Sequence, residues 1–146
     1  MKQTIKVLLD TVLARVPKQN GDSAGYDFWG VRIDDEFNKT FTVSTDVRMI
    51  IPKGKVGILK ERSSIGVKGC KLLAGVIDSD YRGVIKVVYP IEYKELILDM
   101  IHNGKAIAQM VIVDYCSLET EVVGSDEYFG NTTARGDGGF GSSDKA

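Results

Sequence analysis

Short runs rich in valine, isoleucine and threonine alternate with turn residues along most of the chain. The runs cover residues 4–9, 41–43, 47–51, 55–59, 84–89 and 106–113, and their β-branched composition favours strands. Turn residues separate them at positions 18–22, 52–54, 80–83 and 102–104. Many short strands with closely spaced turns predict an all-β domain, a sandwich or barrel.

Two segments depart from the strand pattern. Residues 63–69 predict one short helix, because serines cap helix starts well and a glycine follows. The apolar positions of residues 91–101 suit a helix as well as a strand. We interpret this segment as a hairpin arm, since it lies between strands and ends in Asn103-Gly104, a dipeptide typical of tight turns.

Composition places the chain among globular proteins. Its 146 residues have the length of one ordinary domain, with 43% hydrophobic and 27% charged residues. A net charge of -1 argues against nonspecific attraction to nucleic acid or to anionic membranes. No apolar run reaches the roughly 18 residues that a membrane-spanning helix needs, and the first residues lack the apolar part of a secretory signal. We therefore expect a cytoplasmic protein, with Cys70 and Cys116 reduced and buried and with no zinc site.

Two segments carry groups suited to phosphate. In Arg62-Ser63-Ser64-Ile65-Gly66, a guanidinium, hydroxyls and helix-start amides can converge on one anion, although a plain capped turn has the same sequence. Near the C-terminus, Arg135-Gly136-Asp137-Gly138-Gly139-Phe140-Gly141-Ser142-Ser143 places one aromatic ring among four glycines. Such a tail suits closure over a ligand, while chain ends of this composition are more often solvated and disordered.

Carboxylates and one amide mark three further segments. Asp78 ends an apolar run and Tyr81 follows it, an arrangement that suits a water-orienting base beside a sugar ring and equally an ordinary hairpin. Asp27 follows a loop rich in glycine, asparagine and aspartate and suits a hydrated magnesium ion, although most loop aspartates are merely solvated. Gln109 lies among apolar residues, so its amide needs a partner from a ligand or the backbone.

In this order, the five segments resemble the five motifs of the deoxyuridine triphosphate diphosphatases of the homotrimeric all-β family, the dUTPases. The motifs correspond, in chain order, to Ala24-Gly25-Tyr26-Asp27, Arg62-Ser63-Ser64-Ile65-Gly66, residues 75–83, residues 104–109 and residues 135–143. They span nearly the whole chain. Five ordered motifs are much harder to meet by chance than any one glycine pattern.

The resemblance implies that dUTP is hydrolysed to dUMP and pyrophosphate with Mg²⁺ as cofactor. Asp78 would orient and deprotonate the water that attacks the α-phosphorus, Tyr81 would pack on the deoxyribose, and Asp27 would touch the magnesium ion through water. The other implied substrate contacts are Arg62, Ser63, Ser64 and Gln109 at the phosphates, Gly75, Val76 and Ile77 beside uracil, and Arg135, Phe140, Gly141, Ser142 and Ser143 in the tail.

The resemblance also implies an organisation. A distorted jelly roll or β-barrel of many short strands with one short helix would cover residues 1–130, and a flexible glycine-rich lid would cover residues 131–146. The chain would assemble as a homotrimer whose active sites draw the third motif and the tail from neighbouring subunits. Some relatives carry asparagine where this chain has Leu72, so backbone groups around residues 72–76 would recognise uracil here. Glu61 precedes Arg62 where a small residue or proline is more usual, and its carboxylate competes with phosphate for the guanidinium. Trp29 has no assigned role.

Two alternatives share features with this interpretation. The dCTP deaminases have the same fold, but they need a glutamate about ten residues beyond the shared aspartate, where this chain has Val88, a residue that cannot transfer protons. A nucleotide-binding regulatory module is the other alternative. Asp78, Tyr81 and Arg135 together favour a working catalyst over such a module.

Overall fold

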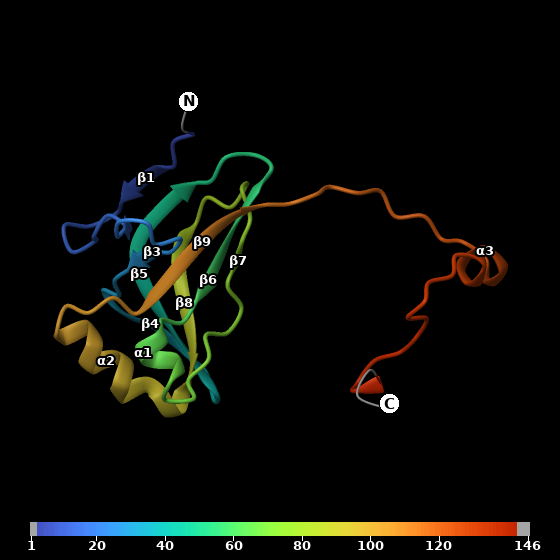
Figure 1. Ribbon diagram of the computed structural model, residues 1–146. Coiled ribbons are helices and arrows are strands. Elements are labelled where there is room, and N and C mark those ends of the chain that lie inside the picture. The colour runs from blue at the N-terminus through green and yellow to red at the C-terminus, as the bar shows by residue number, and fades with distance from the viewer. Residues whose placement is uncertain (1–2, 143–146) are drawn as a thin grey trace. The chain divides into compact units, whose positions relative to one another are not determined.

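The computed structural model describes residues 3–142, which divide into two units, residues 3–116 and residues 117–142 (Figure 1). The first unit contains two antiparallel sheets and most of the buried side chains. This architecture confirms the prediction of an all-β jelly roll with a few short helices. The expected functional boundary between residues 130 and 131 stays a prediction.

The first sheet is built around one long strand. β5 (Thr40–Ile50) pairs with β4 (Arg32–Glu36) along its first half and with β1 (Lys6–Leu9) along its second half. β8 (Val84–Pro90) pairs with both halves of β5. The register of β5 with β8 shifts between Ser44 and Arg48, so a bulge bends the strand at its middle.

Residues of the first, third and fourth motifs lie in strands of the second sheet. Its strands run in the order β2 (Lys18–Gln19), β3 (Tyr26–Phe28), β9 (Ala108–Asp114), β6 (Lys55–Lys60) and β7 (Val76–Ile77). Asp27 on β3 and Lys60 on β6 both lie opposite Gln109 on β9. The register therefore brings the first and fourth motifs together beside the end of β6, where the second motif begins.

Apolar side chains from both sheets fill the space between them. Phe28 and Met110 come from the second sheet, and Phe41 and Tyr89 come from the first, each at most 1% exposed. The Tyr89 hydroxyl donates a hydrogen bond to the Ile107 carbonyl oxygen, which joins β8 to the segment before β9. The two sheets thus form one core, and the site residues lie on its rim.

The helical segments follow the strands at two places. α1 (Ser63–Gly66) follows β6, and η1 (Ile91–Tyr93) leads into α2 (Lys94–His102) after β8; Figure 1 shows α1 and α2 near the same end of the sheets. The predicted short helix is confirmed, but no serine caps it, because Arg62 holds the N-cap position without a side-chain cap. The description of residues 91–101 as a hairpin arm was wrong.

The segment of residues 91–101 is helical because its apolar side chains fall on one face. Ile97 and Met100 are buried, three positions apart, as expected for the inner side of a helix. The Asn103-Gly104 dipeptide ends the helix instead of turning a hairpin. Gly104 has a φ of 65°, and the amides of Gly104 and Lys105 donate to the carbonyl oxygens of Ile101 and Met100, the pattern of a Schellman motif.

The second unit consists of a short helix and turns. α3 (Ser125–Gly130) carries Tyr128 and Phe129, whose rings lie edge to face with centroids 5.3 Å apart. Both rings are exposed. Across residues 3–142, no helix is long and apolar enough to cross a membrane.

Candidate active site

Side chains from three motifs converge at the end of β6. The Arg62 guanidinium lies beside the Asp27 carboxylate, with Nε 3.3 Å from Oδ1. Arg62 also donates from Nη1 to the Ala106 carbonyl oxygen at 3.4 Å. Gln109 donates from Nε2 to the carbonyl oxygen of Glu61 at 3.1 Å. We call Asp27, Arg62 and Gln109 the phosphate cluster; the structure brings these three predicted residues together.

Ser63 and Ser64 lie directly beside the phosphate cluster, exposed at the start of α1. The Asp27 carboxylate is further held by Asn20, which donates from Nδ2 to Oδ2 at 3.2 Å. Because Asp27 already pairs with Arg62, an incoming anion at Arg62 meets a guanidinium that is oriented but partly neutralised. The sequence had indicated Glu61 as the competitor for Arg62, whereas the structure pairs Arg62 with Asp27.

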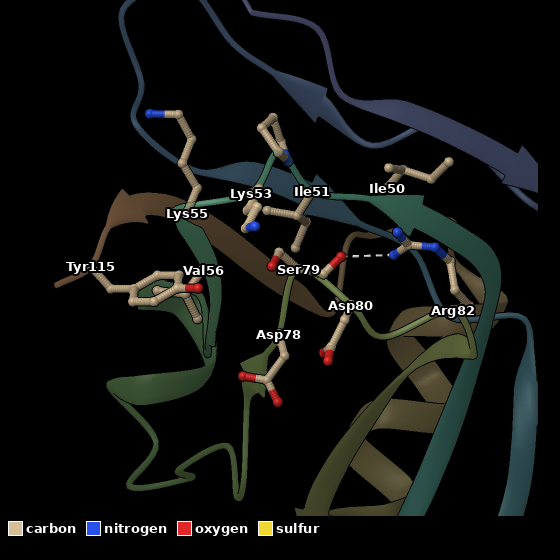
Figure 2. A pocket seen from close by; sticks show the side chains of 11 residues that line it. Ile50, Ile51, Lys53, Lys55, Val56, Asp78, Ser79, Asp80, Arg82 and Tyr115 are labelled. Atoms are coloured by element: carbon tan, nitrogen blue, oxygen red, sulfur yellow. Dashed lines mark hydrogen bonds between the residues drawn. The ribbon is translucent and has the colours of Figure 1, made fainter. Parts of the chain in front are cut away.

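Asp78 lies in the turn after β7, exposed to solvent. It lines a surface pocket of about 700 Å³ together with Lys55 and Arg82. Figure 2 shows the carboxylates of Asp78 and Asp80 on the side of the turn away from Lys55. Arg82 folds back and donates from Nη1 to the Ser79 carbonyl oxygen at 2.7 Å, the dashed line in Figure 2. The turn is thereby fixed by its own arginine, with Asp78 open to water.

Tyr81 lies on the same turn and is 41% exposed. Its hydroxyl donates to the Val84 carbonyl oxygen at 2.9 Å, so the ring is held with part of its surface in solvent. Arg48, paired with Asp10 at 3.0 Å, donates from Nη1 to the Arg82 carbonyl oxygen and braces the turn from β5. Tyr81 is therefore a fixed apolar surface next to Asp78, as packing on a sugar requires.

The segment before β7 is held by its backbone. The amide of Leu73 donates to the Val88 carbonyl oxygen at 2.9 Å, and the amide of Leu59 donates to the Gly75 carbonyl oxygen at 2.8 Å. Ala74 between them is exposed and has a φ of 57°. Val76 is also exposed, at 65%, and Ile77 is half-buried. This segment, residues 72–75, is called the base loop below.

The predicted tail residues lie in the second unit, and their geometry is local. Arg135 donates from Nε to the Gly138 carbonyl oxygen at 2.7 Å, and the amide of Gly138 donates back to the Arg135 carbonyl oxygen. Phe140 is fully exposed and has a φ of 51°. Gly141 and Ser142 are exposed beside it, and Ser143 lies outside the described residues.

A sequence model described as dUTPase matches residues 14–144, almost the whole chain. The chain belongs to the dUTPase family. It is similar to the deoxyuridine 5'-triphosphate nucleotidohydrolase of Candida albicans, with 36% identity over 98% of this chain and 89% of that protein. The corresponding protein of Paramecium bursaria Chlorella virus 1 is 35% identical over 94% of each chain. The chain is thus an enzyme of nucleotide metabolism, a hydrolase of the dUTPase family.

Solved dUTPase structures share its fold. The dUTPase of Staphylococcus bacteriophage 80alpha with dUpNHpp matches with a TM-score of 0.77 and 29% identity, over 97% of this chain and 98% of that one. A mutant dUTPase of phage phi11 of S. aureus, whose structure is described as revealing the coordination of a structural Mg(II) ion, matches with a TM-score of 0.69 and 25% identity over 86% and 99%.

The donor set of this dUTPase fits a magnesium ion held mostly by substrate. Among residues 3–142, no group of three or more histidine, cysteine, aspartate or glutamate side chains is placed to hold a metal. Asp27 is the single carboxylate of the phosphate cluster, and its side chain is 15% exposed. Mg²⁺ usually keeps several waters and binds through one or two carboxylates plus substrate phosphates, which matches this arrangement.

Three supporting residues of the site were not found from the sequence. Asn20 and Arg48 hold Asp27 and the Asp78 turn, and Arg15 lies 4.0 Å from the centroid of the Trp29 ring while donating to the Gly104 carbonyl oxygen. The contacts of Arg48 and Arg15 join positions far apart in the chain, and Asn20 reaches Asp27 through the pairing of β2 with β3, so no local pattern indicates these roles. Trp29 now has a role as the aromatic partner of Arg15 between two motifs.

Proposed function

We propose that this member of the dUTPase family hydrolyses dUTP to dUMP and pyrophosphate, with Mg²⁺ on the phosphates and with Asp78 activating the attacking water. The reaction limits uracil in DNA and supplies dUMP. The observation that carries the proposal is the phosphate cluster, in which Asp27, Arg62 and Gln109 from three family motifs meet at one point of the sheet. The cytoplasmic location stays a prediction.

The chemistry follows from the charges and hydrogen-bonding groups present. Arg62, Gln109 and the hydroxyls of Ser63 and Ser64 bind and orient the phosphate oxygens. Asp27 would hold Mg²⁺ through water, and the ion would neutralise charge on the phosphates. Phosphoanhydride hydrolysis asks the protein mainly to position the nucleophile and to stabilise charge that develops on the oxygens. Asp78 accepts the proton of the attacking water, because its exposed carboxylate is open to a water molecule.

Specificity is assigned to the base loop and to Tyr81. Backbone groups of residues 72–76 pair with the edge of uracil, and Gly75, Val76 and Ile77 shape a slot too narrow for the methyl group of thymine. Tyr81 packs on the deoxyribose and leaves no room for a 2'-hydroxyl. In the tail, Arg135, Ser142 and Ser143 bind the γ-phosphate while Phe140 and Gly141 cover the base, so that residues 131–146 act as a lid that excludes water.

The register of the second sheet supports active sites shared between subunits. Because Ile77 lies opposite Gly57, Asp78 lies level with Val56, whereas Asp27 lies level with Lys60. Four residues along β6 and three strand spacings across the sheet separate the two aspartates by about 20 Å. An aspartate side chain is too short for that distance, so another copy of the chain supplies Asp78 to each phosphate cluster. A homotrimer, the expected assembly, satisfies this requirement by symmetry.

The first test measures pyrophosphate release from dUTP, dTTP, dCTP and UTP with Mg²⁺. We expect rapid release from dUTP and little from the others. Asp78→Asn should lower kcat by about 10²-fold or more, since it removes a general base. The matched control is Asp114→Asn, an exposed carboxylate paired with Lys55, and it should retain activity. Unchanged pyrophosphate release from the Asp78 variant refutes the assignment of the base.

A second test concerns the lid. Chains that end at Thr133 should keep the assembly state of the full chain but lose most turnover, because Arg135 and Phe140 are removed. Normal turnover after this truncation would refute the proposed role of the tail as a lid.

The deaminase alternative gains no support, because Val88 lies in the ladder opposite Thr42 and accepts a hydrogen bond from the Leu73 amide, with no titratable group at that position. Release of ammonia from dCTP would support the deaminase alternative.

A further inference from the structure

Glu61 lies between the phosphate cluster and the base loop. Its carbonyl oxygen accepts the hydrogen bond from Gln109 Nε2 at 3.1 Å. Its carboxylate oxygen Oε2 accepts a hydrogen bond from the amide of Leu72 at 3.0 Å. The next residue in the chain is Arg62, which pairs with Asp27. Within one chain, Glu61 therefore contacts both the phosphate cluster and the base loop, which in the shared-site arrangement serve two different active sites.

The base loop depends on few attachments. Besides the hydrogen bond to Glu61, two backbone hydrogen bonds hold the loop. The Leu73 amide donates to the Val88 carbonyl oxygen, and the Gly75 carbonyl oxygen accepts from the Leu59 amide. Glu61 supplies the side-chain attachment at the N-terminal end of the loop. The Leu72 side chain is buried at 5% exposure, so its amide is fixed in a place where bulk water does not readily replace the carboxylate.

The Glu61 carboxylate is suited to a permanent hydrogen bond. Its side chain is 18% exposed, and Lys60 Nζ lies 3.4 Å from the other carboxylate oxygen, Oε1. Burial alone would raise the pKa of Glu61, but the hydrogen bonds from the amides of Leu72 and of Glu61 itself, with the nearby Lys60, hold the pKa below its ordinary value. Glu61 is therefore ionised at neutral pH, and hydrogen bonds to ionised groups are stronger than neutral ones.

The strain in the loop indicates why this bond matters. Ala74 has a φ of 57°, a left-handed conformation that costs a residue with a side chain about 1 kcal/mol or more and persists only where neighbouring contacts impose it. Leu72 lies two residues before Ala74, so the bond from Glu61 fixes the start of the strained segment. Without that bond, the Leu72 amide loses its acceptor, and the loop keeps only its backbone attachments at Leu73 and Gly75.

We propose that Glu61 is a positioning residue for base recognition, which holds the backbone of the base loop in the conformation that pairs with uracil. The proposal rests on the proposed function, because it assumes that the base loop contacts the base. Glu61 itself does not touch substrate. It acts through Leu72, and the next residue in the chain, Arg62, belongs to the phosphate cluster.

The experiment compares three variants of the full chain. Glu61→Ala removes the acceptor of the Leu72 amide, Glu61→Gln keeps an acceptor oxygen, and Lys60→Ala removes the neighbouring charge while leaving the hydrogen bond. For each, KM and kcat are measured with dUTP, kcat/KM is measured with dTTP, and inhibition constants are measured for dUMP and for pyrophosphate. Thermal unfolding and assembly state are recorded for every variant.

We expect Glu61→Ala to raise KM for dUTP and the inhibition constant of dUMP about tenfold, the lower end of what a hydrogen bond to a charged group is worth. Its kcat and its inhibition constant for pyrophosphate should change less than about twofold, because pyrophosphate engages only the phosphate cluster. The preference for dUTP over dTTP should fall. Glu61→Gln and Lys60→Ala should remain within about threefold of the wild type, since both keep the Leu72 bond.

Two results would overturn the proposal. If Glu61→Ala weakens the binding of dUMP and of pyrophosphate equally, Glu61 stabilises the whole site and not the base loop in particular. If Glu61→Ala binds dUMP with the affinity of the wild type, the hydrogen bond to Leu72 is dispensable. If Glu61→Ala fails to assemble, the Glu61→Gln variant decides. Its side-chain oxygen can still accept the hydrogen bond from the Leu72 amide, so a stable Gln variant that has lost dUMP affinity would contradict the proposal. Failure of the wild type to hydrolyse dUTP would instead refute the proposed function.

Discussion

Two variants that are each inactive should restore activity when their subunits are mixed. Asp78→Asn removes the proposed base, and Arg62→Ala removes the guanidinium of the phosphate cluster. The two residues serve the same reaction, yet the register places Asp78 about 20 Å from the Asp27 carboxylate that pairs with Arg62 within one chain. The proposed reaction therefore requires Asp78 from one subunit and Arg62 from another at each site.

The size of the recovery follows from this sharing. In a random 1:1 mixture, half of the subunits that donate Asp78 and half of those that donate Arg62 are intact. Because the two donors are chosen independently, about a quarter of the sites contain both an intact Asp78 and an intact Arg62. About a quarter of wild-type activity should therefore return. The wild type mixed 1:1 with a chain carrying both substitutions should likewise fall to about a quarter, whereas sites contained in one chain would leave half.

The assay is pyrophosphate release after the subunits are dissociated, mixed and reassembled. Each variant treated alone is the control for recovery that arises from contamination or from the treatment itself. Light scattering on the same samples gives the assembly state, which we expect to be trimeric. Mixtures that stay at the background of the separate variants, although mixed oligomers are demonstrated, would refute shared sites and the reasoning from the strand register.

Three further predictions concern individual side chains. Arg32 lowers the pKa of buried Asp46 from 3.8 to about 2. Asp46→Asn should therefore lower the free energy of unfolding by about 2 kcal/mol at pH 7. In urea unfolding, the stability difference between wild type and variant should shrink as the pH falls below about 4 toward 2, and a difference independent of pH contradicts this. Gly25→Ala would place a Cβ 2.4 Å from Gln109 Oε1, and KM for dUTP should rise about tenfold with little loss of stability, since the change displaces a phosphate ligand. Cys70 is buried as expected, but the expectation that Cys116 is buried was wrong, because Cys116 is exposed. A thiol reagent should therefore react rapidly with Cys116 alone in the native protein, because burial raises the pKa of Cys70 to about 11; two fast thiols would count against this burial.

Where strand composition and turn residues agreed, the sequence was sufficient to predict the element. β1, β6, β8 and β9 all lie within or close to the predicted runs. β3 and β4 were not predicted, because Tyr26–Phe28 is short and Arg32–Glu36 is mostly charged and exposed. Such strands are specified by their partners in the sheet more than by their own composition.

The long strand β5 shows a different limit. The sequence indicated two strands, residues 41–43 and 47–51, with a break between them, while the structure has one strand with a bulge. The break is polar but buried. Ser44 and Asp46 hydrogen-bond to each other at 2.6 Å, and Thr45 donates to the Ile85 carbonyl oxygen. Polar residues that satisfy one another inside a sheet resemble a turn when only composition is considered.

The candidate site divides in the same way between local and distant information. The motif residues could be named from the sequence because each motif is local and their order is distinctive, but their roles depend on register, which the sequence does not display. Asp27, Arg62 and Gln109 meet because β3, β9 and β6 pair side by side, and Asp78 stays apart because β7 pairs with β6 in the register that sets it level with Val56. A shift of β7 by two residues along β6 would move Asp78 by about 7 Å and leave every motif unchanged. The proposed division of the active site between subunits therefore rests on strand pairing, and the motifs alone cannot specify it.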